Sequence, residues 1–311
     1  MILVLTCLND ATADMVIGHL NKHDAVVARF DPGADFPADA ELSAWFGRAS
    51  PYGVLTTRSR RIVLEQVRAV YYRRPTPYLP DGPSQVERFA GTQARFGVGE
   101  VLAALPCPYV SHPWAITAAE HKPLQLATAR RVGFEVPATL ITNSVDDARA
   151  FADRHGPIVY KPLRATPYTG PDGEPATIWT AEVEPDDLDD TISRTAHLFQ
   201  ARVDKTADLR VTVVGERVFC VRIDSDLLDW RQDYDRLSYT VIEPPTGLAD
   251  ACHAYLGAFG LRFGAFDLAL TRDGVPVFLE CNPNGQWGWL EDATGLPIAA
   301  AIADLLLEEA P

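Results

Sequence analysis

Two carboxylates near the C-terminal end of the chain have the spacing of a metal site. If Asp273-Gly274 forms the centre of a type I′ β-turn, the hairpin register places Asp267 directly opposite Glu280. Asn282 follows Glu280 by two residues and therefore lies on the same face. Two negative charges about 5 Å apart repel by roughly 3 kcal/mol at an effective dielectric near 20, a cost that a divalent cation would remove. Two carboxylates and an amide oxygen are hard ligands, which favours Mg²⁺.

The same residues also fit a simpler interpretation, in which the carboxylates keep a solvated hairpin face soluble. Their neighbours Phe266, Leu268 and Phe278 are apolar, which indicates a largely covered hairpin and favours the metal. A register shift of one residue would separate the two carboxylates. Both interpretations stay open, with the metal site preferred.

Two lysines occupy positions at which an anionic ligand would stabilise them. Lys122 precedes Pro123, a typical first helical residue, so its charge lies at the positive end of a helix. Lys161 ends an apolar strand just before a Pro- and Gly-rich loop or hairpin over 164–177. A nucleotide polyphosphate would neutralise both lysines, whereas either one alone could equally be an exposed side chain.

Two pairs of arginines are further candidates. Arg210 and Arg222 flank the turn Gly215-Glu216, but a two-residue loop puts them on opposite faces, so they share a site only if a bulge intervenes. Arg73 and Arg74 follow a short strand and could bind an acidic substrate or bridge two domains.

These candidates lie on elements that the residue pattern predicts along the whole chain. Strand and helix patterns alternate at the start, which indicates an α/β domain; they cover 2–6, 12–21, 25–30, 69–72 and 84–104. A second unit begins near residue 117 with helices and strands at 123–132, 138–142, 145–155 and 158–160. The last third contains hairpins over 209–223 and 265–279, with a helix at 249–259 between them.

The composition excludes several classes of protein. The chain has 311 residues, 28 Lys+Arg against 42 Asp+Glu, and a net charge of −14, which disfavours nucleic acid or an anionic membrane as a partner. Five widely spaced cysteines indicate reduced thiols and a cytoplasmic protein rather than disulfides or a zinc site. No signal peptide or membrane span is predicted.

Several motifs together resemble the ATP-grasp superfamily, and most closely the ATP-grasp ribosomal peptide maturases (graspetide or microviridin-type peptide cyclases). The motifs are Tyr71-Tyr72-Arg73-Arg74-Pro75, His121-Lys122-Pro123, Tyr160-Lys161-Pro162, Asp208-Leu209-Arg210, Phe266-Asp267 and Glu280-Cys281-Asn282-Pro283-Asn284-Gly285-Gln286-Trp287. The last motif is the most specific. The resemblance covers nearly the whole chain.

This resemblance implies an α/β and α+β fold, with an N-terminal pre-ATP-grasp domain over 1–116 and two ATP-grasp subdomains over 117–203 and 204–311. It implies ATP and Mg²⁺ as cofactors and assigns roles to matching residues. Lys122, Lys161, Gln200, Ala201, Arg202 and Val203 would bind ATP; Asp267, Glu280 and Asn282 would bind the metal; Arg210 and Arg222 would be catalytic; Arg73, Arg74, Arg231 and Trp287 would contact the substrate.

The hypothesis that follows is an ATP-dependent ligase. It would convert Asp or Glu side chains of a ribosomal precursor peptide, which carries a leader and a Thr/Ser plus Asp/Glu core, into acyl phosphates. A Ser or Thr hydroxyl or a Lys amine of the same peptide would then close a side-chain ester or amide ring. A homodimer is left open. Two alternatives remain: an amino-acid or poly-glutamate ligase acting on a peptide or protein terminus, and an ATP-binding regulatory protein without turnover.

Overall fold

The N-terminal part of the protein is built on a four-stranded parallel sheet. The computed structural model describes residues 1–47, 50–78, 84–164, 166 and 168–308. The strand order is β2-β1-β6-β7. These strands are β1 (Ile2–Leu5), β2 (Val27–Phe30), β6 (Ala69–Tyr72) and β7 (Tyr109–Val110). Helix α1 (Ala11–Lys22) connects β1 to β2 and starts at Asp10, whose carboxylate accepts a hydrogen bond from the Ala13 amide. The α/β prediction for this part is confirmed.

An antiparallel meander, which the sequence pattern did not reveal, lies beside this sheet. It consists of β3 (Ala40–Trp45), β4 (Tyr52–Thr57) and β5 (Arg61–Val63), and a short helix α2 (Pro32–Asp35) precedes it. The helix predicted at 84–104 is found as α3 (Gln85–Ala94), a π-turn at Arg95–Gly99 and α4 (Glu100–Ala103), followed by α5 (Pro113–Ala119). Ser84 and Glu87 form a capping box at the start of α3.

The central part has a small antiparallel sheet, covered on one face by a helix. Its strand order is β12-β9-β13-β8. The strands are β8 (Thr139–Thr142), β9 (Ile158–Lys161), β12 (Ala181–Val183) and β13 (His197–Ala201). Helix α7 (Val145–His155) supplies Ala148 to a core with Ile158 and Phe199. Between β9 and β12 a two-stranded hairpin forms from β10 (Tyr168–Thr169) and β11 (Pro175–Ala176), although residues 165 and 167 of the predicted loop lie outside the described residues.

The C-terminal part is a five-stranded antiparallel sheet with the order β16-β15-β14-β17-β18. Its strands are β14 (Lys205–Val214), β15 (Arg217–Asp224), β16 (Ser238–Ile242), β17 (Phe263–Thr271) and β18 (Pro276–Asn282). Helices α6 (Lys122–Arg131) and α8 (Leu248–Phe259) pack on one face, where Phe134, Tyr255, Phe266 and Phe278 form an aromatic core. These two helices do not cover the opposite face of β14, β17 and β18, which can therefore form a site.

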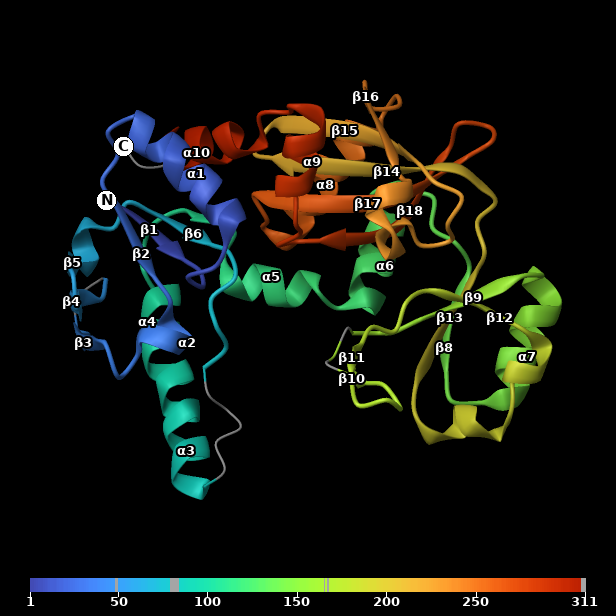
Figure 1. Cartoon of the computed structure of the whole chain (residues 1–311), viewed down its shortest axis with the longest axis horizontal. Helices are drawn as coiled ribbons and strands as arrows, with labels where there is room; N and C mark the ends of the chain where they lie inside the picture. The colour runs from blue at the N-terminus through green and yellow to red at the C-terminus, as the bar shows by residue number, and fades with distance from the viewer. Residues whose placement is uncertain (48–49, 79–83, 165, 167, 309–311) are drawn as a thin grey trace.

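The last helix returns to the start of the chain. After α9 (Gly288–Thr294), helix α10 (Ile298–Glu308) lies beside α1 (Figure 1). Seven of its eleven residues are buried, and they share one core with Val4, Val16 and Tyr71. The N- and C-terminal parts are therefore joined through a common core, and the division of the chain at 116/117 and 203/204 stays a prediction. Across the described ranges, no helix has the length and apolar character needed to span a membrane.

Candidate active site

A cavity of about 590 Å³ lies between the central sheet and the open face of the C-terminal sheet. The described residues that line it include eight basic and five acidic side chains, a surplus of three positive charges in a chain of net charge −14. The basic set is Arg74, Lys122, Lys161, Arg164, Arg202, Lys205, Arg210 and Arg231, and the acidic set is Glu120, Asp208, Asp229, Asp267 and Glu280. The cavity is therefore suited to an anionic ligand.

The β17–β18 hairpin brings Asp267 and Glu280 together as predicted, but by a different geometry. The turn has three residues: the Thr271 amide donates to the Val275 carbonyl at 3.1 Å, and Gly274 adopts φ +78°. This register alone would misalign the pair by one residue. A β-bulge at Leu279 restores it, so Asp267 pairs with Glu280 and Ala265 pairs with Asn282.

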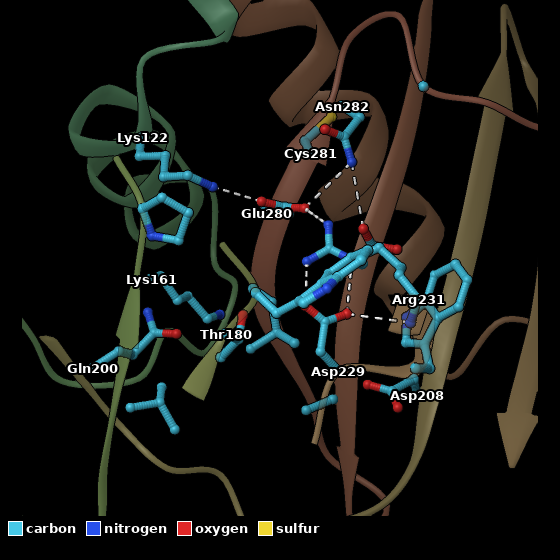
Figure 2. Close-up of a pocket in the computed structure, with 18 of the residues that line it drawn as sticks. Lys122, Lys161, Thr180, Gln200, Asp208, Asp229, Arg231, Glu280, Cys281 and Asn282 are labelled. Carbon is cyan, nitrogen blue, oxygen red and sulfur yellow. Dashed lines mark hydrogen bonds and ion pairs between the residues drawn. The ribbon is translucent and has the colours of Figure 1, made fainter. Parts of the chain in front are cut away.

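The Glu280 carboxylate is held from two sides. Lys122 Nζ donates to one oxygen at 2.6 Å, and Arg231 Nη1 donates to the other at 2.6 Å (Figure 2). Burial by itself raises the pKa of Glu280, but the charges of Lys122 and Arg231 hold that pKa well below its usual range. Arg231 also binds both oxygens of Asp229 at 2.8 Å. Glu280 is therefore an anion at neutral pH.

Asp267 has its own cationic partner. Arg210 Nη1 donates to Asp267 Oδ1 at 2.8 Å, and Arg210 Nη2 donates to the main-chain oxygen of Gln286 at 2.8 Å. Burial raises the pKa of the Asp267 carboxyl, and Arg210 opposes this shift. Arg210 and Asp267 are directly paired across the β14–β17 ladder, which fixes their contact.

The three predicted metal ligands form a set of oxygen donors that fits Mg²⁺. Asn282 Nδ2 lies 3.4 Å from Asp267 Oδ2 and 3.5 Å from Glu280 Oε1, so a rotation of the amide group would place its oxygen beside both carboxylates. In the described ranges no three His, Cys, Asp or Glu side chains are grouped for a metal ion. The third side-chain oxygen at this site would therefore come from the Asn282 amide, and two carboxylates with one amide suit a cation that retains water.

Helix α6 is fixed to the hairpin by a side chain one turn after Lys122. Gln125 is 5 % exposed; its Nε2 donates to the Cys281 carbonyl at 2.9 Å, and its Oε1 accepts from the Cys281 amide at 3.0 Å. Gln125 thus satisfies the backbone of the edge strand β18 and aims Lys122 at Glu280.

The central sheet contributes the predicted nucleotide residues. Lys161, at the end of β9, and Gln200, on β13, face the cavity from the side opposite the hairpin (Figure 2). Gln200, Ala201, Arg202 and Val203 all line the cavity. Burial lowers the pKa of Lys161 to about 8, and within the described residues its ammonium has no hydrogen bond. An ammonium desolvated in this way is a ready partner for an anion.

Three predicted site residues lie elsewhere. Arg222 is on the face opposite Arg210, because the β14–β15 ladder pairs Arg210 with Val221 without a bulge, and Arg222 binds Asp224 at 2.6 Å. Arg73 is 2 % exposed and does not line the cavity, in contrast to Arg74. Trp287 is fully buried in the core shared with Tyr71. The predictions that Arg222 is catalytic and that Arg73 and Trp287 contact substrate therefore do not fit the structure.

Asp208 and Lys205 are among the cavity residues that were not identified as site residues from the sequence. Asp208 lines the cavity, binds Lys205 Nζ at 2.6 Å, and has a pKa that burial raises to about 6. Its position two residues before Arg210 on one strand places both side chains on the same face, a signal that could have revealed it. Lys205 precedes a bulge in β14, which no sequence signal indicates.

The fold and the site together define an ATP-grasp protein, in which two α+β subdomains enclose an anion-binding cavity. A family model described as the MvdD pre-ATP grasp domain matches residues 1–95. A comparison with curated protein sequences found no match.

Several solved structures are similar over the whole chain. The macrocyclase MdnB from Microcystis aeruginosa is 31% identical, with 98% of each chain covered and a TM-score of 0.80. The macrocyclase MdnC from the same organism, bound with precursor peptide MdnA, is 29% identical, with 99% of each chain covered and a TM-score of 0.88. A RiPP-associated ATP-grasp ligase from Chryseobacterium gregarium, in complex with ADP and a leader and core peptide, is 27% identical; the match covers 100% of this chain and 97% of that chain, with a TM-score of 0.91. This chain belongs to the ATP-grasp ligases that mature ribosomal peptides.

Proposed function

We propose that this protein is an ATP-dependent ligase that closes side-chain rings in a ribosomal precursor peptide. It activates Asp or Glu side chains as acyl phosphates and joins them to Ser or Thr hydroxyls as esters, or to Lys amines as amides. The observation that carries the proposal is the convergence of Lys122, Arg210 and Arg231 on the carboxylates of Asp267 and Glu280 inside one cavity. Fixed charges of this kind stabilise the charge that develops during phosphoryl transfer.

ATP occupies the half of the cavity next to the central sheet. Lys122 and Lys161 bind its phosphates, and the segment of Gln200, Ala201, Arg202 and Val203 holds the adenine beside Trp179; all of these residues line the same cavity. Asp267, Glu280 and Asn282 would hold Mg²⁺, which when bound would offset the negative charge of the phosphate oxygens. The structure of the Chryseobacterium relative in complex with ADP supports a nucleotide as the ligand of this fold.

The substrate carboxylate approaches from the side of the two arginines. Arg210 and Arg231 orient it, with Arg74 at the rim of the cavity. Its oxygen attacks the γ-phosphorus, the bond from that phosphorus to the β–γ bridging oxygen breaks, and ADP leaves. The hydroxyl or amine of the same peptide then attacks the acyl carbon, the bond to the phosphate oxygen breaks, and the released phosphate takes up the proton. The protein contributes position and charge without a covalent intermediate of its own.

The core peptide lies against an aromatic wall. Trp230, Tyr234 and Trp289 line the cavity, and Trp289 packs 5.4 Å from Trp230 and 5.5 Å from Tyr234, measured between ring centroids. Aromatic rings bind peptide side chains and backbone with little loss of conformational entropy.

Because the five cysteines are free thiols, we propose the cytoplasm as the site of action.

The test uses the purified full chain with ATP, Mg²⁺ and peptides that carry a leader and a core rich in Thr/Ser and Asp/Glu. We expect ATP consumption that depends on the peptide, and a product lighter by one water for each bond formed. Hydroxylamine treatment, which cleaves esters but not amides, identifies the linkage.

Two outcomes would contradict the proposal. A product heavier by an added amino acid would instead identify a ligase acting on a peptide or protein terminus. Tight ATP binding without consumption for any acidic peptide would identify a regulatory ATP-binding protein.

A further inference from the structure

We propose that Arg73, a residue of the N-terminal sheet, is a positioning residue for the active site. It holds the segment 283–287, which directly follows the metal ligand Asn282, and through this segment it orients Arg210. The part of the inference that concerns turnover rests on the proposed function; the part that concerns the position of the segment does not.

Arg73 is buried and its guanidinium is committed to this segment. Its side chain is 1 % exposed. Nη1 donates to the main-chain oxygen of Asn284 at 2.7 Å and lies 3.2 Å from its Oδ1, while Nη2 donates to Gln286 Oε1 at 2.5 Å. The Asn284 amide donates back to the Arg73 carbonyl. The two terminal nitrogens of this buried guanidinium are satisfied by the segment, whereas its Nε has no hydrogen bond within the described residues. Because burying these donors without partners would be costly, the contacts of Nη1 and Nη2 determine where the segment lies.

The N-terminal domain anchors the other side of Arg73. Asp10 Oδ2 lies 3.9 Å from Arg73 Nε, and Asp10 is itself fixed by the Thr6 hydroxyl at 2.6 Å. Thr12, in the first turn of α1, donates to Gln286 Oε1 at 3.2 Å, so Gln286 accepts from both Thr12 and Arg73. The segment 283–287 is therefore attached to the first turn of α1.

The same segment contacts Arg210 at its other side. The main-chain oxygen of Gln286 accepts from Arg210 Nη2 at 2.8 Å, while Arg210 Nη1 binds Asp267. The backbone passes so closely that a Cβ added at Gly285 would lie 2.7 Å from the Ala265 Cβ and 3.0 Å from Arg210 Nη2. A shift of the segment would therefore move Arg210, which lines the cavity and binds the proposed metal ligand Asp267.

Arg73 itself does not line the cavity. Its effect must reach the reaction through Gln286 and Arg210, which makes the N-terminal domain part of the catalytic geometry. A misplacement of about 1 Å in a catalytic group can reduce a rate by roughly 10²-fold, so a loss of this size is expected when the segment is released.

The experiment compares Arg73→Lys with the wild-type chain. Lysine keeps a positive charge beside Asp10 but cannot bind Asn284 and Gln286 together. Three quantities are measured: hydrogen exchange of peptides covering 283–290, Mn²⁺ affinity in the presence of a non-hydrolysable ATP analogue, and kcat with the ATP dissociation constant. Arg29→Lys is the matched control, because Arg29 belongs to the same sheet and also binds main-chain carbonyls, those of Cys7 and Leu8, but not the segment.

For Arg73→Lys we expect faster exchange of the segment, weaker Mn²⁺ binding, kcat lower by about 10²-fold and an ATP dissociation constant within about threefold of wild type. Arg210→Lys by itself should also lower kcat. Adding Arg73→Lys to this variant should lower kcat by less than about threefold more, because both substitutions disrupt the same contacts through Gln286. Arg29→Lys should leave all of these quantities near wild type.

Any of three results would overturn the inference: unchanged exchange of the segment, faster exchange with kcat within about threefold of wild type, or independent, multiplicative losses in the double variant. If the wild-type protein turns over no peptide, the proposed function fails, but exchange and Mn²⁺ binding still decide the role of Arg73. If Arg73→Lys does not fold, the charge-balanced pair Asp10→Asn with Arg73→Gln is measured in the same way, with the same expected losses.

Discussion

Glu280 lies directly across the β17–β18 ladder from Asp267, and each carboxylate is paired with a cation from another element. Lys122 comes from α6, Arg210 from β14 and Arg231 from the segment before β16. Two like charges placed opposite one another destabilise a sheet. The surrounding cations therefore offset the repulsion between the Asp267 and Glu280 carboxylates. Such a cost is understandable if the site binds the metal ion and the polyphosphate that we propose for it.

Glu280→Gln should abolish most of the activity while leaving the protein folded. The change removes one of the two carboxylates that we propose as Mg²⁺ ligands but keeps the shape of the side chain. We therefore expect turnover to fall by about 10²- to 10³-fold with an unchanged circular dichroism spectrum. Asp224→Asn is the control, because Asp224 pairs with Arg222 away from the cavity. Equal losses in both variants would argue against a specific role for Glu280.

Arg210 and Arg222 should respond very differently to substitution. Arg210→Met leaves the buried Asp267 without its partner and removes a cavity-lining cation that we propose to act in phosphoryl transfer. We therefore expect a loss of at least about 10²-fold in kcat. Arg222→Met breaks a half-exposed pair with Asp224 and should change kcat by less than about twofold. Steady-state phosphate release measures both. A large loss for Arg222→Met would contradict its placement away from the reaction.

The hairpin shows how a correct prediction of residue pairing can rest on an incorrect local structure. Asp273-Gly274 was expected to form a two-residue turn, but the loop has three residues and the bulge at Leu279 corrects the register. Turn length and bulge position depend on packing against α6 and on the bridge between Glu135 and Val277, which local sequence does not encode. The pairing of Asp267 with Glu280 was nevertheless predicted correctly, because the extra residue in the turn and the bulge at Leu279 shift the register by one residue in opposite directions.

Long-range packing was not predictable in the same way. Arg73 and Trp287 carry residue types common at substrate sites, and nothing in their neighbouring residues shows that both would be buried. Their burial follows from the return of α10 to α1, which brings the end of the chain onto the first sheet. By contrast, Lys122, Lys161 and Arg210 lie at the ends or on one face of local elements, and these positions could be predicted from periodicity and capping.

Nucleotide binding should weaken with rising pH because of Lys161. Burial lowers the pKa of Lys161 to about 8, and only the ammonium form attracts phosphate, so affinity for an ATP analogue should fall about fivefold from pH 8 to pH 9. Isothermal titration calorimetry measures this, together with proton uptake on binding. Lys161→Met should bind weakly with little slope in this range. A flat profile in the wild-type chain would contradict the prediction.

The same shift links folding to pH. The unfolded chain keeps the Lys161 proton up to the ordinary value of 10.5, whereas the folded chain loses it near 8. Between these values the unfolded state binds more protons, so this residue makes the free energy of unfolding rise with pH. Urea titrations of the nucleotide-free protein should show this rise, and Lys161→Met should reduce it; the opposite sign would contradict the pKa shift.

Two tryptophans two residues apart should separate stability from substrate binding. Trp287 is fully buried, so Trp287→Ala should cost about 3–5 kcal/mol of unfolding free energy through the cavity it leaves. Trp289 lines the active-site cavity and packs 5.5 Å from Tyr239 between ring centroids. Trp289→Ala should therefore raise the KM for the precursor peptide and lower the free energy of unfolding by less than Trp287→Ala does. Urea unfolding and peptide-dependent ATP consumption measure the two effects. A raised KM for Trp287→Ala with full stability, or an unfolded Trp289→Ala, would reverse the roles assigned to these residues.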